Sequence, residues 1–155
     1  MLSKSKFLAM AAVALALTGC SQTPTHKPIS VTDGITVDAS GLTVGMCLNE
    51  EAATGAVGIA QKVDCAKPHF GEVMSEGKIT LPGDTFDEAK VAELGNEYCI
   101  KSFETFDGLR YDKSSLQMFP LVPTEKSWSA GDRIITCIVY DQTQLITGTL
   151  KGSNR

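Results

Sequence analysis

The chain has 155 residues, of which 14 are Lys or Arg and 18 are Asp or Glu, and its formal net charge is −4. This length suits one domain of ordinary size, and the acidic balance argues against a nucleic-acid partner. Hydrophobic residues make up 43% and charged residues 21% of the chain, which is typical of a folded globular protein and excludes wholesale disorder. No apolar run reaches the roughly 18 residues that a membrane span needs.

Residues 1–19 have the features of a secretory signal peptide. Two lysines are the only charges before Cys20, and an unbroken apolar run, Phe7–Leu17, follows them. Such a run is too short for a stable membrane span. It ends in Leu17-Thr18-Gly19-Cys20, which resembles the bacterial lipobox. We therefore expect cleavage before Cys20 and lipid attachment to its thiol; the alternative is an ordinary signal peptide in which Cys20 is incidental.

Lipidation would make the membrane the first partner of this protein. Two or more acyl chains, palmitate among them, hold a protein stably on a bilayer where a single chain does not. The expected location is the outer face of the cytoplasmic membrane. Residues 20–41 would then be the lipidated N-terminus and a flexible tether, because the stretch 21–40 is rich in Pro, Ser and Thr and has no helical period.

The folded domain is predicted over residues 42–152. Its first elements are a short apolar strand at 42–48 and a loop at 49–58. Two strands with alternating polar and apolar residues follow at 60–65 and 70–80. A turn at Leu81-Pro82-Gly83-Asp84 closes this first half of the domain.

The next element is a helix over residues 86–106. Thr85 and Glu88 have the S/T-x-x-E spacing of a capping box. Gly95 lowers the helix propensity by about 1 kcal/mol relative to Ala, and Gly108 is a natural stop. Apolar residues at helical spacing predict one buried face: Ala92, Cys99, Phe103 and Phe106.

Strands dominate the rest of the chain. A strand at 116–122 contains Pro120 and should lie at a sheet edge. The loop at 123–129 carries Trp128, and the apolar stretch 133–140 predicts a central strand that is buried on both faces. A short strand at 147–150 is expected last. The order of strands, helix and strands predicts an α+β fold with a small antiparallel sheet and one main helix packed on a face.

Four cysteines remain in the predicted domain, and no two of them have C-x-x-C spacing. Zinc sites and redox motifs usually need that close pair. An exported chain with an even number of cysteines therefore favours two disulfides over free thiols or a metal site. Three connectivities are open. The simplest joins Cys47 to Cys65, on neighbouring short strands, and Cys99 on the helix to Cys137 in the strand beneath it.

Several motifs together resemble the septum-formation domain family of actinobacterial envelope proteins. They are V-G-M-C at 44–47, V-D-C-A-K-P-H-F-G-E-V at 63–73, the helical Cys99, S-W-S-A-G-D-R at 127–133, Cys137 in the final strand and T-G-T-L-K-G at 147–152. The resemblance implies an extracytoplasmic domain anchored by lipid or by a single span, with a link to division septa. It implies no mechanism.

His69 and Trp128 are the two candidate residues for a binding surface. His69 and Glu72 lie three residues apart on an extended segment, which places their side chains on opposite faces and is unfavourable for an acid–base pair. His69 either contacts a ligand at the Pro68 turn or hydrogen-bonds the turn backbone. Trp128 is either a recognition anchor or a packing residue beside Gly131 and Asp132.

The sequence favours a non-catalytic role. We find no G-x-S-x-G elbow, no H-E-x-x-H and no glycine-rich phosphate loop, and we expect no catalytic residue, metal or cofactor. The first hypothesis is a binding or adaptor domain of the cell envelope, with an envelope or division protein as its partner. The alternatives are a ligand-capturing accessory lipoprotein of a transporter or sensor, and a cysteine- or histidine-dependent wall enzyme.

Overall fold

A computed structural model describes residues 35–49 and 59–155. The predicted signal peptide, Cys20 and most of the predicted tether and of the loop at 49–58 lie outside these residues. The described part belongs to one compact unit, Val31–Arg155. None of its helices is both long enough and apolar enough to cross a bilayer.

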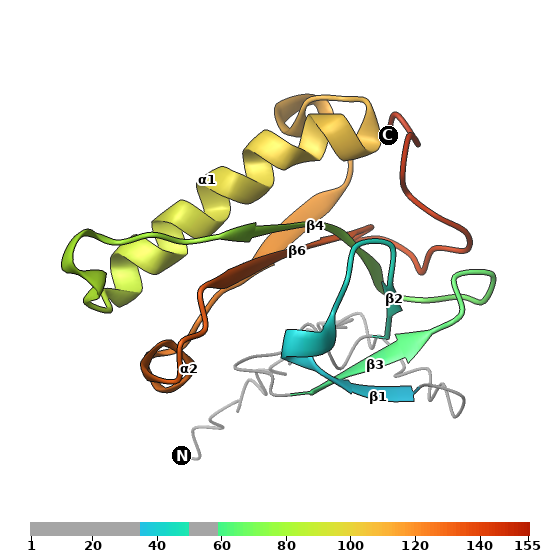
Figure 1. Ribbon diagram of the computed structural model, residues 1–155. Coiled ribbons are helices and arrows are strands. Elements are labelled where there is room, and N and C mark those ends of the chain that lie inside the picture. Colours follow the sequence, from blue (N-terminus) through green and yellow to red (C-terminus); the bar gives the residue numbers. More distant parts are fainter. Residues whose placement is uncertain (1–34, 50–58) are drawn as a thin grey trace, which may run out of the picture. The chain divides into compact units, whose positions relative to one another are not determined.

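Six strands form one sheet in the order β1-β3-β2-β4-β6-β5 (Figure 1), and every neighbouring pair is antiparallel. One long helix, α1 (Glu88–Asp107), lies against β4, β5 and β6. The predicted α+β fold is therefore confirmed. The strands are β1 (Ile35–Asp38), β2 (Cys47–Leu48), β3 (Ile59–Val63), β4 (Gly71–Lys78), β5 (Gln117–Leu121) and β6 (Ile134–Tyr140).

The sheet begins earlier than the sequence predicts. β1 lies in the stretch assigned to the tether, and its residues pair with β3 from Ile35 opposite Lys62 to Asp38 opposite Ile59. A single turn, η1 (Ala39–Gly41), follows, and Asp38 caps it by accepting a hydrogen bond from the Ser40 amide at 2.9 Å. Four residues carry too little alternation to be distinguished from a linker, so only the pairing with β3 reveals the strand.

The start of α1 also differs from the prediction. Asp87 is the N-cap and accepts from the Lys90 amide at 2.9 Å. Thr85 instead follows the turn η3 (Pro82–Asp84), and its hydroxyl contacts the Gly83 carbonyl at 3.4 Å. The predicted stop is confirmed, because Gly108 has a φ of 92°, a left-handed conformation that glycine adopts without strain.

The buried face of α1 is confirmed at Cys99, Phe103 and Phe106, whereas Ala92 is exposed and Val91 takes its place. Gly95 is buried where the helix crosses the end of β5. A Cβ atom there would lie 2.5 Å from Cγ1 of Val122. Gly95 therefore permits a close approach of helix to sheet, which explains its place in the middle of a helix.

Two hydrophobic cores lie on opposite faces of the sheet. The larger core, between α1 and β4, β5 and β6, includes Phe103, Leu116 and Trp128. The smaller core packs the segment before β2 and the strands β2 and β3 against the other face of β4 and β6. Its buried members are Leu42, Leu48, Ala60, Val73 and Ile138.

Both predicted disulfides are present. Cys47 bonds to Cys65 with a Cα–Cα distance of 5.3 Å, and Cys99 bonds to Cys137 with a Cα–Cα distance of 5.5 Å. The second bond joins α1 to the central strand β6 inside the larger core. Cys65 is half-buried, whereas its partner Cys47 is buried completely.

The strand predictions for β5 and β6 are confirmed. β5 is an edge strand that contains Pro120, and β6 lies between β4 and β5. Five consecutive residues of β6, Ile135–Val139, are buried. A proline in an edge strand has no backbone N–H to offer to another strand.

Two predictions for the last part of the chain are wrong, one of a loop and one of a strand. Residues 125–129 form a short helix, α2 (Glu125–Ser129), which Thr124 and Ser127 begin with a reciprocal capping box. The predicted strand at 147–150 is absent, and only Ile146 forms an isolated bridge, to His69. A five-residue helix has no measurable periodicity. The segment after β6 is held by backbone hydrogen bonds to other segments and by several side chains.

Asp141 is one of these side chains. It is buried and accepts hydrogen bonds from the Thr143 amide at 2.8 Å and from Gln144 at 3.1 Å, and it pairs with Arg155. Burial raises the pKa of Asp141, but the hydrogen bonds outweigh it and hold that pKa well below its usual range. The turn η4 (Tyr111–Lys113) lies nearby in the fold, and Ser114, which follows it, donates to the Arg155 carbonyl.

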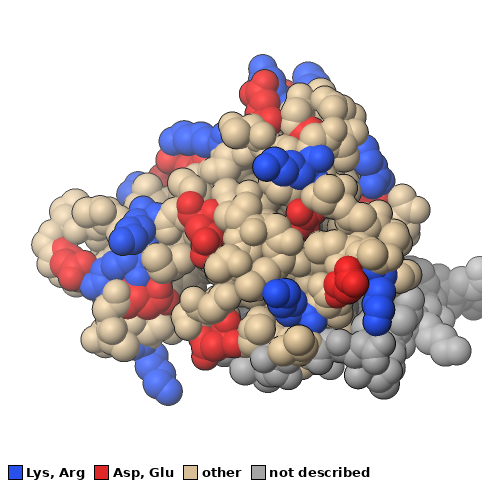
Figure 2. Space-filling view, turned by 45° about the vertical axis from the view of Figure 1, so that its right-hand side comes forward, with Lys and Arg blue, Asp and Glu red and all other residues tan. Residues whose placement is uncertain are grey.

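Charged side chains are mixed on the surface. Figure 2 shows acidic and basic residues interspersed over the face it presents, with uncharged residues between them. No area of one sign dominates that face.

Candidate functional site

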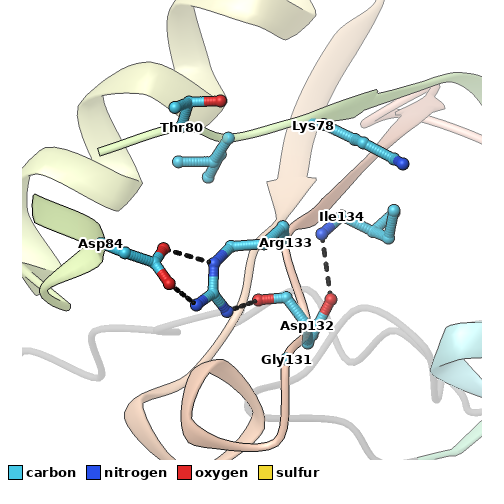
Figure 3. Close-up of a pocket in the computed structure, with 8 residues that line it drawn as sticks. Lys78, Thr80, Asp84, Gly131, Asp132, Arg133 and Ile134 are labelled. Atoms are coloured by element: carbon cyan, nitrogen blue, oxygen red, sulfur yellow. Dashed lines mark hydrogen bonds and ion pairs between the residues drawn. The ribbon is translucent and has the colours of Figure 1, made fainter. Parts of the chain in front are cut away.

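A pocket of about 600 Å³ opens where β4 ends and β6 begins (Figure 3). Its size is within the range of ligand pockets. The lining comes from the end of β4, from η3 and from the turn that precedes β6. The lining residues are Lys78, Ile79, Thr80, Asp84, Gly131, Asp132, Arg133 and Ile134.

The turn after α2 is fixed by its own backbone. The Gly131 amide donates to the Trp128 carbonyl at 2.9 Å, and the Asp132 amide donates to the Ser127 carbonyl at 2.9 Å. Gly131 has a φ of 94°, which favours glycine. The carboxylate of Asp132 then accepts from the Ile134 amide at 2.9 Å. These hydrogen bonds fix the direction in which the chain enters β6.

Arg133 is the centre of the site. Its Nε and Nη2 atoms donate to the two carboxylate oxygens of Asp84 at 3.0 and 2.8 Å (Figure 3). Its Nη1 atom donates to the carbonyls of Trp128 and Asp132 at 2.7 and 2.6 Å. The guanidinium also lies 3.6 Å from the centroid of the Trp128 ring, a favourable cation–π arrangement. Arg133 therefore joins the η3 turn to the α2 turn.

Both the backbone and the side chain of Asp84 form hydrogen bonds with neighbouring residues. Its φ of 54° is uncommon for a non-glycine residue, and its carbonyl accepts from Nε1 of Trp128 at 3.0 Å. The hydrogen bonds from Arg133 keep the pKa of Asp84 below its usual value, against a small opposing effect of burial. The carboxylate is therefore charged, and both of its oxygen atoms accept hydrogen bonds from Arg133.

Trp128 is a packing residue. Its side chain is 4% exposed and lies 5.9 Å from the ring of Phe86, centroid to centroid. The prediction of an exposed recognition anchor is wrong for this side chain, because α2 turns the indole inward under Arg133. None of the residues 123–129 of the predicted loop lines the pocket, whose lining on this side comes from the residues that follow, Gly131, Asp132, Arg133 and Ile134.

His69 is also buried, with 1% of its surface exposed. Its Nδ1 atom lies 2.8 Å from the Lys67 carbonyl, and its backbone exchanges two hydrogen bonds of 2.9 Å with Ile146. Nε2 has no hydrogen-bond partner within the described residues. His69 is therefore not part of an exposed binding surface, and the interpretation that it bonds the turn backbone is the correct one.

Glu72 fixes the segment after β6. Its buried carboxylate accepts from the Thr149 hydroxyl at 2.8 and 2.9 Å and from the Leu150 amide at 2.8 Å. Glu72 therefore has structural partners of its own, and its carboxylate forms no hydrogen bond or ion pair with His69. Neither residue lines the pocket.

Lys78 and Ile134 are the pocket residues that sequence reasoning missed. They are exposed, and they lie opposite each other in the ladder of β4 and β6. In Figure 3 the Lys78 side chain extends away from Arg133 and Asp84. Ile134 is 37% exposed although it begins a strand that is otherwise buried. A single exposed isoleucine at the start of an apolar run gives no signal in the sequence.

The lining of this pocket includes no histidine or cysteine. Arg133 uses four N–H contacts to hold backbone and carboxylate groups. Lys78 is in no ion pair with another described residue and can contribute a positive charge to a ligand. In the described part of the chain, no group of three or more His, Cys, Asp or Glu side chains is placed to hold a metal ion.

Comparison with known proteins gives one match. A family model described as septum formation matches residues 44–154, a span that includes both disulfides, α1 and the pocket. No curated protein and no solved structure matches the chain.

Proposed function

The chain belongs to the septum-formation family, and we propose that it acts as a non-catalytic adaptor of the cell envelope. The family links the domain to septum formation. In this proposal the protein is a lipoprotein, anchored through Cys20 to the outer face of the cytoplasmic membrane. The folded domain then binds an envelope or division protein.

The disulfides support a location outside the cytoplasm. Such bonds form and persist in oxidising compartments and are rare where thiols are kept reduced. Both bonds lie at structural positions, one of them wholly inside the larger core. The predicted signal peptide and lipobox provide the route of export and the anchor.

The pocket beside Arg133 carries the adaptor role. Binding residues are commonly found on turns that a rigid scaffold positions, and here the Arg133 contacts fix two turns around an opening with Lys78 and Ile134 at its rim. An exposed isoleucine beside a lysine offers apolar contact and charge together. The same groups contain no nucleophile with a neighbouring base, which is the minimum for covalent catalysis.

A ligand-capturing lipoprotein is the second candidate. The observation that favours it is the pocket volume of about 600 Å³, because that volume also suits a small molecule. The two candidates differ in what the rim residues touch. A protein partner covers both Lys78 and Ile134, whereas a small ligand occupies the interior and depends less on them.

The test is crosslinking in living cells with recovery of partners through the full-length protein. Ile134→Ser and Lys78→Glu alter the rim without removing a buried group. Their matched controls are Ile100→Ser, which changes an isoleucine of 46% exposure on α1, and Lys113→Glu, which changes an exposed lysine in η4. We expect the rim variants to lose septal partners and the controls to keep them.

Two results would contradict the adaptor role. Equal recovery of septal proteins by rim and control variants would exclude this pocket as the contact surface. Recovery of a transporter or sensor instead of division proteins would favour the second candidate.

The anchor has a separate test in Cys20→Ala. The variant should keep its signal peptide, migrate more slowly on a gel and lose incorporation of labelled palmitate. Normal processing and continued labelling of Cys20→Ala would exclude Cys20 as the lipid attachment site.

A further inference from the structure

A second pocket, of about 480 Å³, lies on the α1 side of β4. It is formed by β4, the C-terminal half of α1, the segment before β2 and the segment after β6. The ladder of β4 is irregular here, with a register shift between Val73 and Ser75. Such bulges are frequent next to functional sites. The lining residues are Val44, Met74, Ser75, Tyr98, Lys101, Ser102, Thr105, Phe106 and Lys151.

Part of this pocket is apolar. Met74 and Phe106 belong to the larger core and also line the opening. Val44 stands at its side with 53% of its surface exposed. Val44 supplies most of the open apolar surface, because Met74 and Phe106 are 3% and 6% exposed, and this surface can accept one side chain of a ligand.

The charges of this pocket are all positive. Lys101 and Lys151 are both exposed and line it, and no acidic residue does so. Lys101 has one carboxylate nearby, that of Glu97 at 3.6 Å, but both side chains are more than half exposed, and such a pair is weak. In a chain of net charge −4, a pocket with two lysines and no carboxylate is suited to an anion.

Ser75 supplies an unsatisfied hydroxyl. Its Oγ atom is buried and has no hydrogen-bond partner among the described residues. Two neighbouring hydroxyls form hydrogen bonds elsewhere, because Tyr98 donates to the Glu76 carbonyl and Ser102 donates to the Tyr98 carbonyl at 2.9 Å. Buried polar groups are nearly always paired, so the unpaired hydroxyl of Ser75 requires an explanation.

We propose that this pocket binds a short peptide segment of a partner protein, one with an apolar side chain next to a carboxylate. The apolar side chain contacts Val44, Met74 and Phe106, the carboxylate meets Lys101 and Lys151, and the peptide backbone pairs with Ser75. The proposal rests on the adaptor function, because it assumes a protein partner. It adds a second contact surface and names the chemistry of that partner.

The Ser75 hydroxyl favours a peptide over a lipid. An acyl chain offers no hydrogen-bond partner, so it would leave the hydroxyl unpaired, as it is in the free domain. A peptide offers an N–H and a C=O at every residue. A bound peptide can therefore form a hydrogen bond with the Ser75 hydroxyl and place a side chain against the apolar wall at the same time.

The experiment selects binders from a displayed library of random heptapeptides with the full-length protein purified from its host. We expect enriched sequences that pair an acidic with an apolar residue. Binding of a synthetic selected peptide, followed by fluorescence anisotropy, should weaken about tenfold or more in the Lys101→Glu, Lys151→Glu double variant. Lys113→Glu is the matched control and should change affinity less than about twofold.

Ser75→Ala gives a readout that a purely structural role would not produce. Removing an unpaired buried hydroxyl should leave the melting temperature unchanged or raise it. The same change should weaken peptide binding about five- to tenfold, because the ligand loses its hydrogen bond. Unchanged affinity in Ser75→Ala would show that the hydroxyl has no part in binding.

Three results would overturn the proposal. They are the absence of an enriched sequence, enrichment without acidic residues, and equal binding by the wild type and the double-lysine variant. A photoactivatable fatty acid that labels this pocket in the absence of any peptide binder would assign the site to lipid. If peptides bind as expected but crosslinking in cells returns no septal protein, peptide binding in this pocket is supported and the adaptor function is excluded.

Discussion

The two disulfides should differ in their reduction by a mild thiol. Reduction requires access of a thiolate to a sulfur atom. Cys65 is half-buried, whereas Cys47, Cys99 and Cys137 are wholly buried. We therefore expect native full-length protein in low dithiothreitol to release the thiols of Cys47 and Cys65 first, while the bond of Cys99 stays intact until the domain unfolds.

The magnitude follows from the length of chain that each bond closes. The separations are 18 residues for Cys47–Cys65 and 38 residues for Cys99–Cys137. The loop-entropy model then gives contributions of about 3.2 and 3.9 kcal/mol. A domain of this size shifts its melting temperature by about 3–6 °C per kcal/mol, so selective reduction should lower that temperature by about 10–20 °C.

The assay combines thiol trapping with a thermal melt. Iodoacetamide labels the released thiols at timed points, and peptide mapping identifies which cysteines carry the label. In the control, Cys47→Ala with Cys65→Ala, no cysteine should be labelled under the same mild conditions. Equal rates for the two bonds, or earlier labelling of Cys99, would refute the argument from exposure.

Three further predictions concern single residues. Trp128→Ala should lower the free energy of unfolding by about 3–5 kcal/mol in urea titrations, because a buried indole is lost; a change below about 1 kcal/mol would contradict this. Gly95→Ala should destabilise by about 1–3 kcal/mol through the clash with Val122, although helix propensity alone predicts a gain; a higher melting temperature would refute the close packing. Asp141 has a lowered pKa in the folded domain. Its contribution to the free energy of unfolding is therefore complete above the pKa of an unfolded Asp, about 3.9, and is lost as the pH falls below that value. Asp141→Asn should therefore show a shallower loss of stability in acid titrations than the wild type, and equal slopes would exclude this role.

The framework of the fold could be predicted where several residues carry one signal. The face of α1 at Cys99, Phe103 and Phe106 follows from their spacing, and Cys137 follows from the strand that this face covers. Those two predictions together favour the disulfide pairing that the structure has. The edge position of β5 follows from Pro120, because a proline removes a donor from the ladder.

Other features depend on contacts between segments that are distant in the chain. β1 exists because β3 pairs with it, and its four residues resemble a linker when read alone. The helix cap moves from Thr85 to Asp87 because the preceding turn uses Thr85. A local motif shows which residues can cap a helix, but the tertiary path of the chain decides which one does.

The candidate site shows the same limit. The sequence singled out Trp128 and His69, which are distinctive residue types that the fold buries. The rim residue Ile134 looks like a core residue in the sequence. Ser75 is also inconspicuous there, since only its unpaired state in the structure marks it.

Pro120 has a consequence for copies of this protein that meet at high local concentration. An exposed sheet edge is a template on which a second sheet can continue the ladder, and repeated addition leads to aggregates. β5 ends the sheet on one side, and its proline leaves a gap in the row of N–H donors along that edge. Crowded copies of the domain therefore have one edge at which growth of a shared sheet is interrupted, so specific side-chain contacts can govern their association there.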